Sequence, residues 1–205
     1  NFLDEINTEN VEAYYQSLLN NGNLEVHAAT KIFKAEFIKQ NNLYFPLGMK
    51  GEDNEWMIRV LRVLNKVDII NRPIYIYRAG RVGSISNSIT KENIVDLLNI
   101  VRNSLIFYRE TTKFDAIKDK ELCFCAYLWF TALGLSTKIS KEDYKKKKKK
   151  FRATAWVCKY SNSKKTKMAY SVYKILGLSG AKRVLGFYIK LKNKKNMNRK
   201  KQESL

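Results

Sequence analysis

The chain has 205 residues and carries 39 Lys and Arg against 19 Asp and Glu, a formal net charge of +20. Hydrophobic residues make up 45% of it, which excludes wholesale disorder and allows one domain with a sizeable core. The charge is unevenly distributed, because residues 1–136 hold 16 basic and 16 acidic side chains, whereas residues 137–205 hold 23 basic and 3 acidic ones. The composition therefore divides the chain into a neutral segment and a strongly basic one.

The elements expected before residue 89 are a mixture of helices and short strands. Apolar residues at helical spacing predict helices at residues 8–19, 31–42 and about 52–64. Runs rich in β-branched and aromatic residues predict short strands at residues 66–70 and 74–77, and residues 24–30 are a further candidate for a short strand. His27 is the only histidine, and since no second His or Cys lies at ligand spacing, a structural role is favoured over a metal site.

From residue 89 onward the pattern is entirely helical, with helices expected at residues 89–110 and 121–136, followed by basic helices and a Lys-rich tail at about 193–205 that we expect to be disordered. Residues 122–135 carry no charge. Because a membrane-spanning helix needs roughly 20 apolar residues, this run favours a buried or interfacial helix. The three cysteines show neither a disulfide framework nor metal spacing, which indicates reduced, buried thiols and a cytoplasmic location.

An acidic pair, Glu52 and Asp53, stands where a loop becomes the helix predicted from residue 52. A carboxylate there can cap free N–H groups and complement the helix dipole, which is the structural interpretation. The same position also suits a carboxylate that accepts a proton from a bound hydroxyl group, so a general base is the functional interpretation. The dipeptide alone favours the cap.

The surrounding motifs strengthen the functional interpretation. KIFKAEFIKQNN is followed by LYFPLG, then by GED at a helix start, by PIYIYR and by a loop that contains SIS. In order and spacing, residues 28–88 resemble the acceptor-side half of bacterial family 2 glycosyltransferases. The resemblance implies an α/β fold, a partial Rossmann-like GT-A domain at residues 1–88, followed by a helical, basic extension at residues 89–205. The chain is then expected to be mostly helical, with a small sheet of two or three strands.

The resemblance also implies an activity, the transfer of a sugar (a hexosyltransferase reaction) from a nucleotide-diphosphate donor to an acceptor hydroxyl, with inversion. Such enzymes build cell-surface polysaccharides or glycolipids. By the resemblance, Asp53 is the general base and Glu52 its supporting neighbour. Family members bind a divalent metal, Mg or Mn, through an Asp-x-Asp motif, which does not occur in this sequence. Only 52 residues precede Asp53. We therefore expect the chain to represent the C-terminal part of such an enzyme, without the donor-binding half and inactive alone.

Four further residues are candidates for substrate binding. Arg78 and Arg81 follow PIYIY, and guanidinium groups suit a diphosphate or an anionic acceptor, with a solvated loop as the alternative. Ser84 belongs to a loop that could close over the acceptor or simply form a turn. Trp56 could stack on a sugar ring near Asp53 or belong to the core.

The basic third of the chain suggests an anionic partner. It contains six consecutive lysines: Lys145, Lys146, Lys147, Lys148, Lys149 and Lys150. Attraction to the anionic cytoplasmic leaflet is the first interpretation, which would make the protein peripheral at the inner face of the membrane. Binding to nucleic acid is the second interpretation. It ranks below the first because no nucleic-acid motif accompanies the charge. The alternative to an enzyme is accordingly a non-enzymatic basic helical module that binds anionic membrane or nucleic acid.

Overall fold

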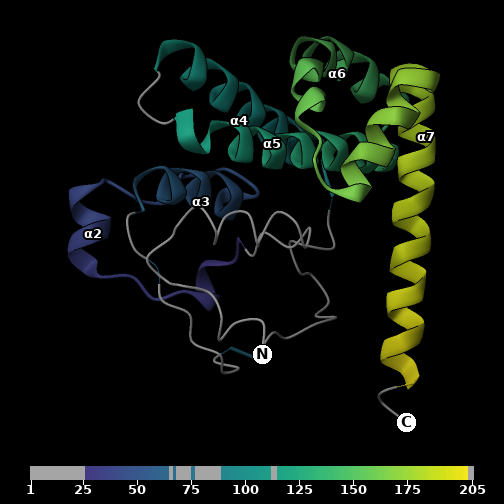
Figure 1. Cartoon of the computed structure of the whole chain (residues 1–205). Coiled ribbons are helices and arrows are strands. Elements are labelled where there is room, and N and C mark those ends of the chain that lie inside the picture. The colour runs from purple at the N-terminus through teal and green to yellow at the C-terminus, as the bar shows by residue number, and fades with distance from the viewer. Residues whose placement is uncertain (1–25, 65–66, 68–74, 77–88, 112–114, 203–205) are drawn as a thin grey trace.

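The structure, a computed structural model, describes residues 26–64, 67, 75–76, 89–111 and 115–202 (Figure 1). The helices within these residues are α2 (Ala35–Gln40), α3 (Glu52–Val63), α4 (Lys91–Glu110), α5 (Asp115–Leu135), α6 (Lys141–Thr154) and α7 (Lys164–Gln202). Three short 3-10 segments accompany them, η1 (Ala28–Thr30), η3 (Ser136–Lys138) and η4 (Ala155–Tyr160). The helices predicted at residues 31–42, 52–64, 89–110 and 121–136 are confirmed as α2, α3, α4 and α5, with shifted ends.

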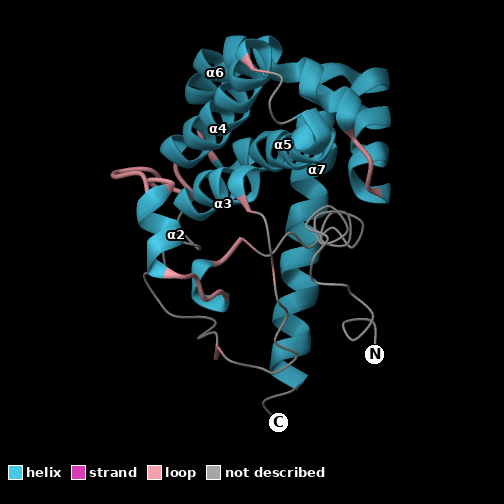
Figure 2. Cartoon of the chain, turned by 60° about the vertical axis from the view of Figure 1, so that its left-hand side comes forward, coloured by secondary structure: helices cyan, strands magenta, loops and turns pink. Residues whose placement is uncertain are grey.

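The prediction of an α/β, Rossmann-like GT-A fold with a small sheet is wrong, because no described residue lies in a strand (Figure 2). The described part of the strand expected at residues 24–30 contains η1 instead. There the Lys31 N–H donates to the Ala28 carbonyl at 3.0 Å, which closes a turn that an extended strand does not make. The strands expected at residues 66–70 and 74–77 lie largely outside the described residues, and Val67, Tyr75 and Ile76, which are described, are not in strands.

Helix α5 is the centre of the fold. It packs against α4, α7 and η4, and buried side chains from all these elements form one core with it. A helix that is apolar on every side has to be covered on most of its surface. That is the case for α5, where Leu122, Cys125 and Trp129 are inaccessible to solvent and Tyr127 is the one large apolar residue of its described side chains that is exposed. None of the helices in the described part of the chain is both long and apolar enough to cross a membrane.

All three cysteines are free and buried, as expected from the sequence. Burial raises the pKa of the Cys125 and Cys158 thiols well above the ordinary value of 9.0. Burial of a thiol in apolar surroundings stabilises its neutral form, which is the unreactive one. These cysteines therefore contribute to packing.

Helix α3 joins a second, smaller core to the first. Its residues Trp56, Met57, Val60 and Leu61 pack with Leu43 and with Phe33 and Phe37 from the segment around α2. On another side of the same helix, Ile58 belongs to the main core. The boundary expected near residue 88 lies outside the described residues, but α3 before it and α4 and α5 after it share this core.

Helix α7 changes direction at Gly177, whose φ of 62° and ψ of −170° are not helical. Beyond the kink it passes close to α5 and η3. A Cβ on Gly186 would collide with Thr137, and a Cβ on Gly134 of α5 would lie 2.5 Å from the Ile189 side chain. At Gly186 the nearest atoms belong to the short Thr137 side chain, so a residue with a Cβ would not fit there unless Thr137 moved. Figure 1 shows that α7 then continues far past the bundle, and its helix includes residues 193–202 of the expected tail.

Candidate functional site

The acidic pair lies at the beginning of α3, and glycine sets the geometry there. Gly51 is the N-cap residue and has a left-handed backbone with φ of 82°, a conformation that side-chain-bearing residues rarely adopt. The Asn54 N–H and the Asn54 side-chain amide both donate to the Gly51 carbonyl, at 3.0 and 3.2 Å. Gly51 has no side chain that could cap the free N–H groups of the helix. The acidic residues of the first turn, Glu52, Asp53 and Glu55, complement the helix dipole instead.

Asp53 has a specific neighbour. Its Oδ2 atom lies 3.4 Å from Nδ1 of His27, and the two side chains are 28% and 57% exposed. The carboxylate is therefore open to solvent on one side and paired with an imidazole on the other. The sequence favours a structural role for His27 and does not bring these two residues together, because 26 positions separate them and neither belongs to a motif that contains the other.

The backbone of His27 is fixed by local hydrogen bonds. Its carbonyl accepts bonds from the Thr30 N–H at 3.2 Å, the Thr30 hydroxyl at 2.8 Å and the Lys31 ammonium at 3.0 Å. Three donors on one carbonyl oxygen hold η1 in place. The imidazole is thus presented to Asp53 from an anchored turn.

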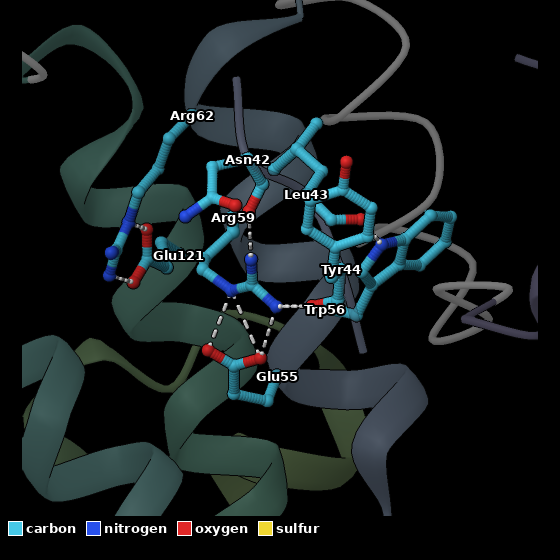
Figure 3. A network of polar contacts seen from close by, with 8 residues as sticks. All are labelled: Asn42, Leu43, Tyr44, Glu55, Trp56, Arg59, Arg62 and Glu121. Atoms are coloured by element: carbon cyan, nitrogen blue, oxygen red, sulfur yellow. Dashed lines mark hydrogen bonds and ion pairs between the residues drawn. The ribbon is translucent and has the colours of Figure 1, made fainter. Parts of the chain in front are cut away.

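The other first-turn acids differ from Asp53 in their contacts. Glu55 is engaged by Arg59 through three bonds of 2.8 to 3.1 Å, and Arg59 also donates to the carbonyls of Asn42 and Tyr44 at 3.2 and 2.5 Å (Figure 3). Glu55 and Arg59 therefore fasten the preceding loop to α3. Glu52 is partly exposed and adjoins Asp53 in the chain.

The turn before α3 is also tied to α4. The Lys50 N–H donates to Asp96 Oδ2 at 2.9 Å, and the Lys50 ammonium donates to the Thr90 hydroxyl at 3.3 Å. Thr90 caps α4 together with Asn93, which accepts the Thr90 N–H at 2.8 Å. The start of α3 is consequently held from three directions, by the η1 turn, by the loop before it and by α4.

Trp56 is buried rather than presented at the surface. It is 3% exposed, its indole N–H donates to the Leu43 carbonyl at 2.9 Å, and the rings of Phe33 and Phe45 lie 5.1 and 4.7 Å from it. Its position fits the core interpretation, in which it supports the helix that carries Asp53. The remaining substrate-binding candidates, Arg78, Arg81 and Ser84, lie outside the described residues.

The divalent metal that the resemblance implies would need a set of ligands among the described side chains. Among them there is no group of three or more His, Cys, Asp or Glu side chains placed to bind one ion. His27 and Asp53 supply two donors, fewer than the protein ligands of most metal sites. This part of the chain therefore does not provide a metal site, and the chemistry considered below uses only its own side chains.

The six consecutive lysines lie on α6. Successive helical residues are rotated by about 100°, so six in a row encircle the helix and cannot all face one surface. Lys145, Lys146, Lys149 and Lys150 are exposed, whereas Lys147 and Lys148 are partly buried. The exposed members share one side of α6, which also carries Glu142, an ion-pair partner of Lys146 at 2.6 Å. This basic face of α6 has no large exposed apolar side chain.

Comparisons of the chain with protein-family models, with curated proteins and with solved structures found no match.

Proposed function

We propose that this chain supplies the acceptor side of an inverting glycosyltransferase, with Asp53 as the general base. The observation that carries the proposal is the Asp53 carboxylate itself: partly exposed at the start of α3, 3.4 Å from His27, on a turn anchored to three neighbouring segments. An anchored carboxylate that is open to solvent on one side can accept a proton from a bound hydroxyl. The motifs from residue 28 to residue 88 support the same assignment.

The proposed reaction requires only one proton acceptor from this chain. Asp53 takes the proton of the acceptor hydroxyl as that oxygen attacks the anomeric carbon of the donor sugar. On the opposite face of the sugar the bond to the nucleoside diphosphate breaks, and the diphosphate leaves with the bonding electron pair, so the configuration inverts. Glu52 and His27 flank the base. A divalent metal, when bound by the donor-side part of such an enzyme, neutralises the leaving diphosphate.

The test is a transfer assay on the longest natural polypeptide that contains this sequence. We expect Asp53→Asn to reduce turnover by roughly 10²- to 10⁴-fold, the usual contribution of a general base, while the variant still folds cooperatively. Asp119→Asn, which alters an exposed carboxylate on α5, is the matched control. Near-normal turnover of the Asp53 variant would sink the assignment. Titration of nucleotide-sugar into the present chain is expected to show no tight binding.

We place this reaction at the cytoplasmic face of a membrane, where polysaccharide and glycolipid acceptors are held. The basic face of α6 supports that location, because each basic residue near an anionic leaflet contributes about 1 kcal/mol of attraction. The same face favours the second candidate function, a non-enzymatic basic module for membrane or nucleic acid. In that case Asp53 would only stabilise the start of α3, and the transfer assay would detect no activity in any natural form of the protein.

A further inference from the structure

A stripe of apolar side chains runs along the outside of α7 beyond its kink. Val184, Phe187, Tyr188 and Leu191 are 41%, 64%, 45% and 50% exposed. They stand at positions i, i+3, i+4 and i+7, the spacing that places side chains along one side of a helix. We call these four residues the outer stripe of α7.

The outer stripe is distinct from the face by which α7 joins the bundle. That inner face includes Ala181, which is fully buried, Leu185 and Ile189, which lie beside Gly134, and Gly186, which touches Thr137. The helix therefore has two apolar faces. The inner face accounts for its packing in the fold, and the outer stripe remains exposed.

Basic residues border the outer stripe on both sides. With about 100° of rotation per residue, Arg183 and Lys190 fall on one flank of the stripe and Lys192 on the other. All three are exposed. The sequence of α7 contains no Asp or Glu anywhere between Lys164 and Gln202. Whatever covers the stripe must therefore be apolar at its centre and anionic at its edges.

An anionic lipid bilayer has this layout. A helix lying in the plane of the interface buries its apolar side at the headgroup boundary while basic residues on its flanks meet anionic headgroups. Tyrosine is suited to that boundary, since its ring is apolar and its hydroxyl group is polar. A nucleic acid would match the basic residues, but its phosphate backbone offers nothing to Val184 and Leu191.

We propose that the outer stripe of α7, with Arg183, Lys190 and Lys192, is a membrane-binding surface that inserts at the headgroup boundary of an anionic bilayer. It is separate from the six-lysine run on α6, which lacks exposed apolar side chains and attracts the surface only by charge. The inference does not depend on the proposed enzymatic activity, because it rests on α7 alone.

The test is co-sedimentation of the chain with phosphatidylserine-containing vesicles and with pure phosphatidylcholine vesicles. We expect binding to the anionic vesicles, and the double variant F187S/L191S should lose at least about tenfold in partition coefficient, because binding strength scales with the buried apolar area. The matched control is I32S/L47S, which removes two apolar side chains that are 79% and 99% exposed at the opposite end of the described chain. Its binding should be unchanged.

A second pair of variants distinguishes the contribution of α7 to vesicle binding from that of α6. The triple variant of α7, R183Q/K190Q/K192Q, should weaken vesicle binding more than the triple variant of α6, K145Q/K146Q/K149Q. Each variant removes three positive charges. Thermal unfolding by circular dichroism checks that all variants fold, which their exposed positions favour.

Three results would overturn the proposal. One is equal vesicle binding by F187S/L191S and the unmodified chain. Another is a chain that ignores both kinds of vesicle but binds single-stranded RNA, with no effect of F187S/L191S. The third is a dimer in analytical ultracentrifugation that F187S/L191S dissociates without any vesicle binding, which would make the stripe an interface between two copies of the chain.

Discussion

The guanidinium group of Arg62 on α3 and the carboxylate of Glu121 on α5 form a two-pronged ion pair, with N–O distances of 2.9 and 2.6 Å, and the Glu121 side chain is fully buried (Figure 3). The Tyr108 hydroxyl on α4 donates to the same carboxylate at 2.7 Å. Arg62 also lies over the Phe107 ring at 3.7 Å. Three helices thus meet at one carboxylate, and they include the helix that carries Asp53.

Removing one partner of this pair should be costly. Glu121→Ala leaves the Arg62 charge partly buried without a counter-charge, and we expect a loss of about 3–5 kcal/mol in the free energy of unfolding. The loss is measured by urea denaturation. The double variant R62M/E121L, which replaces both charges by apolar groups, should recover much of it. If Glu121→Ala were as stable as the unmodified chain, the pair would not hold α3 to α5.

Arg59 is predicted to secure the loop before α3. Arg59→Lys keeps the charge but loses the planar fork that reaches Glu55 and the carbonyls of Asn42 and Tyr44 together. We expect it to lower the free energy of unfolding by about 1–3 kcal/mol, since hydrogen bonds to charged groups contribute about that much. Arg152→Lys on the exposed side of α6 is a suitable control. Equal effects of the two substitutions would contradict the role given to Arg59.

Gly186 should not tolerate a side chain. Gly186→Ala places a Cβ against Thr137, and overpacking of this kind costs about 1–3 kcal/mol. Adding Thr137→Ala removes the two closest side-chain atoms and should restore part of the stability, as measured by thermal or urea unfolding. Failure of the second substitution to help would indicate that the strain arises elsewhere.

The protein should lose stability in alkali. The pKa values of the Cys125 and Cys158 thiols are raised by burial above the ordinary 9.0, so above about pH 9 these thiols ionise in the unfolded chain but not in the folded one. Their contribution to stability is complete below pH 9 and is lost as pH rises further, by up to about 1.4 kcal/mol per pH unit for each thiol.

The measurement is urea unfolding across this pH range. Cys158→Ala removes one of the two thiols and should make the decline in stability with pH shallower, whatever its effect on stability at neutral pH. Lysine deprotonation affects both proteins alike, so the difference in slope isolates the thiol. Identical slopes would show that Cys158 does not titrate differently in the two states.

Helical spacing in the sequence predicted α2, α3 and α4, because each has an apolar side that matches its period, whereas α5 was indicated by the uncharged apolar run at residues 122–135. The prediction of a short strand around His27 was wrong, because so short a run carries little periodic information. The chain forms a local turn there instead, in which three donors bind the His27 carbonyl. The sequence placed Asp53 at a helix start correctly. It did not show its contact with His27, since such contacts depend on the folded chain and not on spacing.

The overhang of α7 has a consequence for its own backbone. Ile189 lies beside Gly134, and the helix continues for 13 residues beyond it to Gln202, a distance of about 20 Å. Residues of this last stretch repeat like charges four apart, such as Lys190 with Lys194 and Lys195 with Arg199, which weakens an isolated helix. Amide hydrogen exchange should therefore accelerate progressively toward Gln202, and anionic vesicles should slow it by neutralising that repulsion.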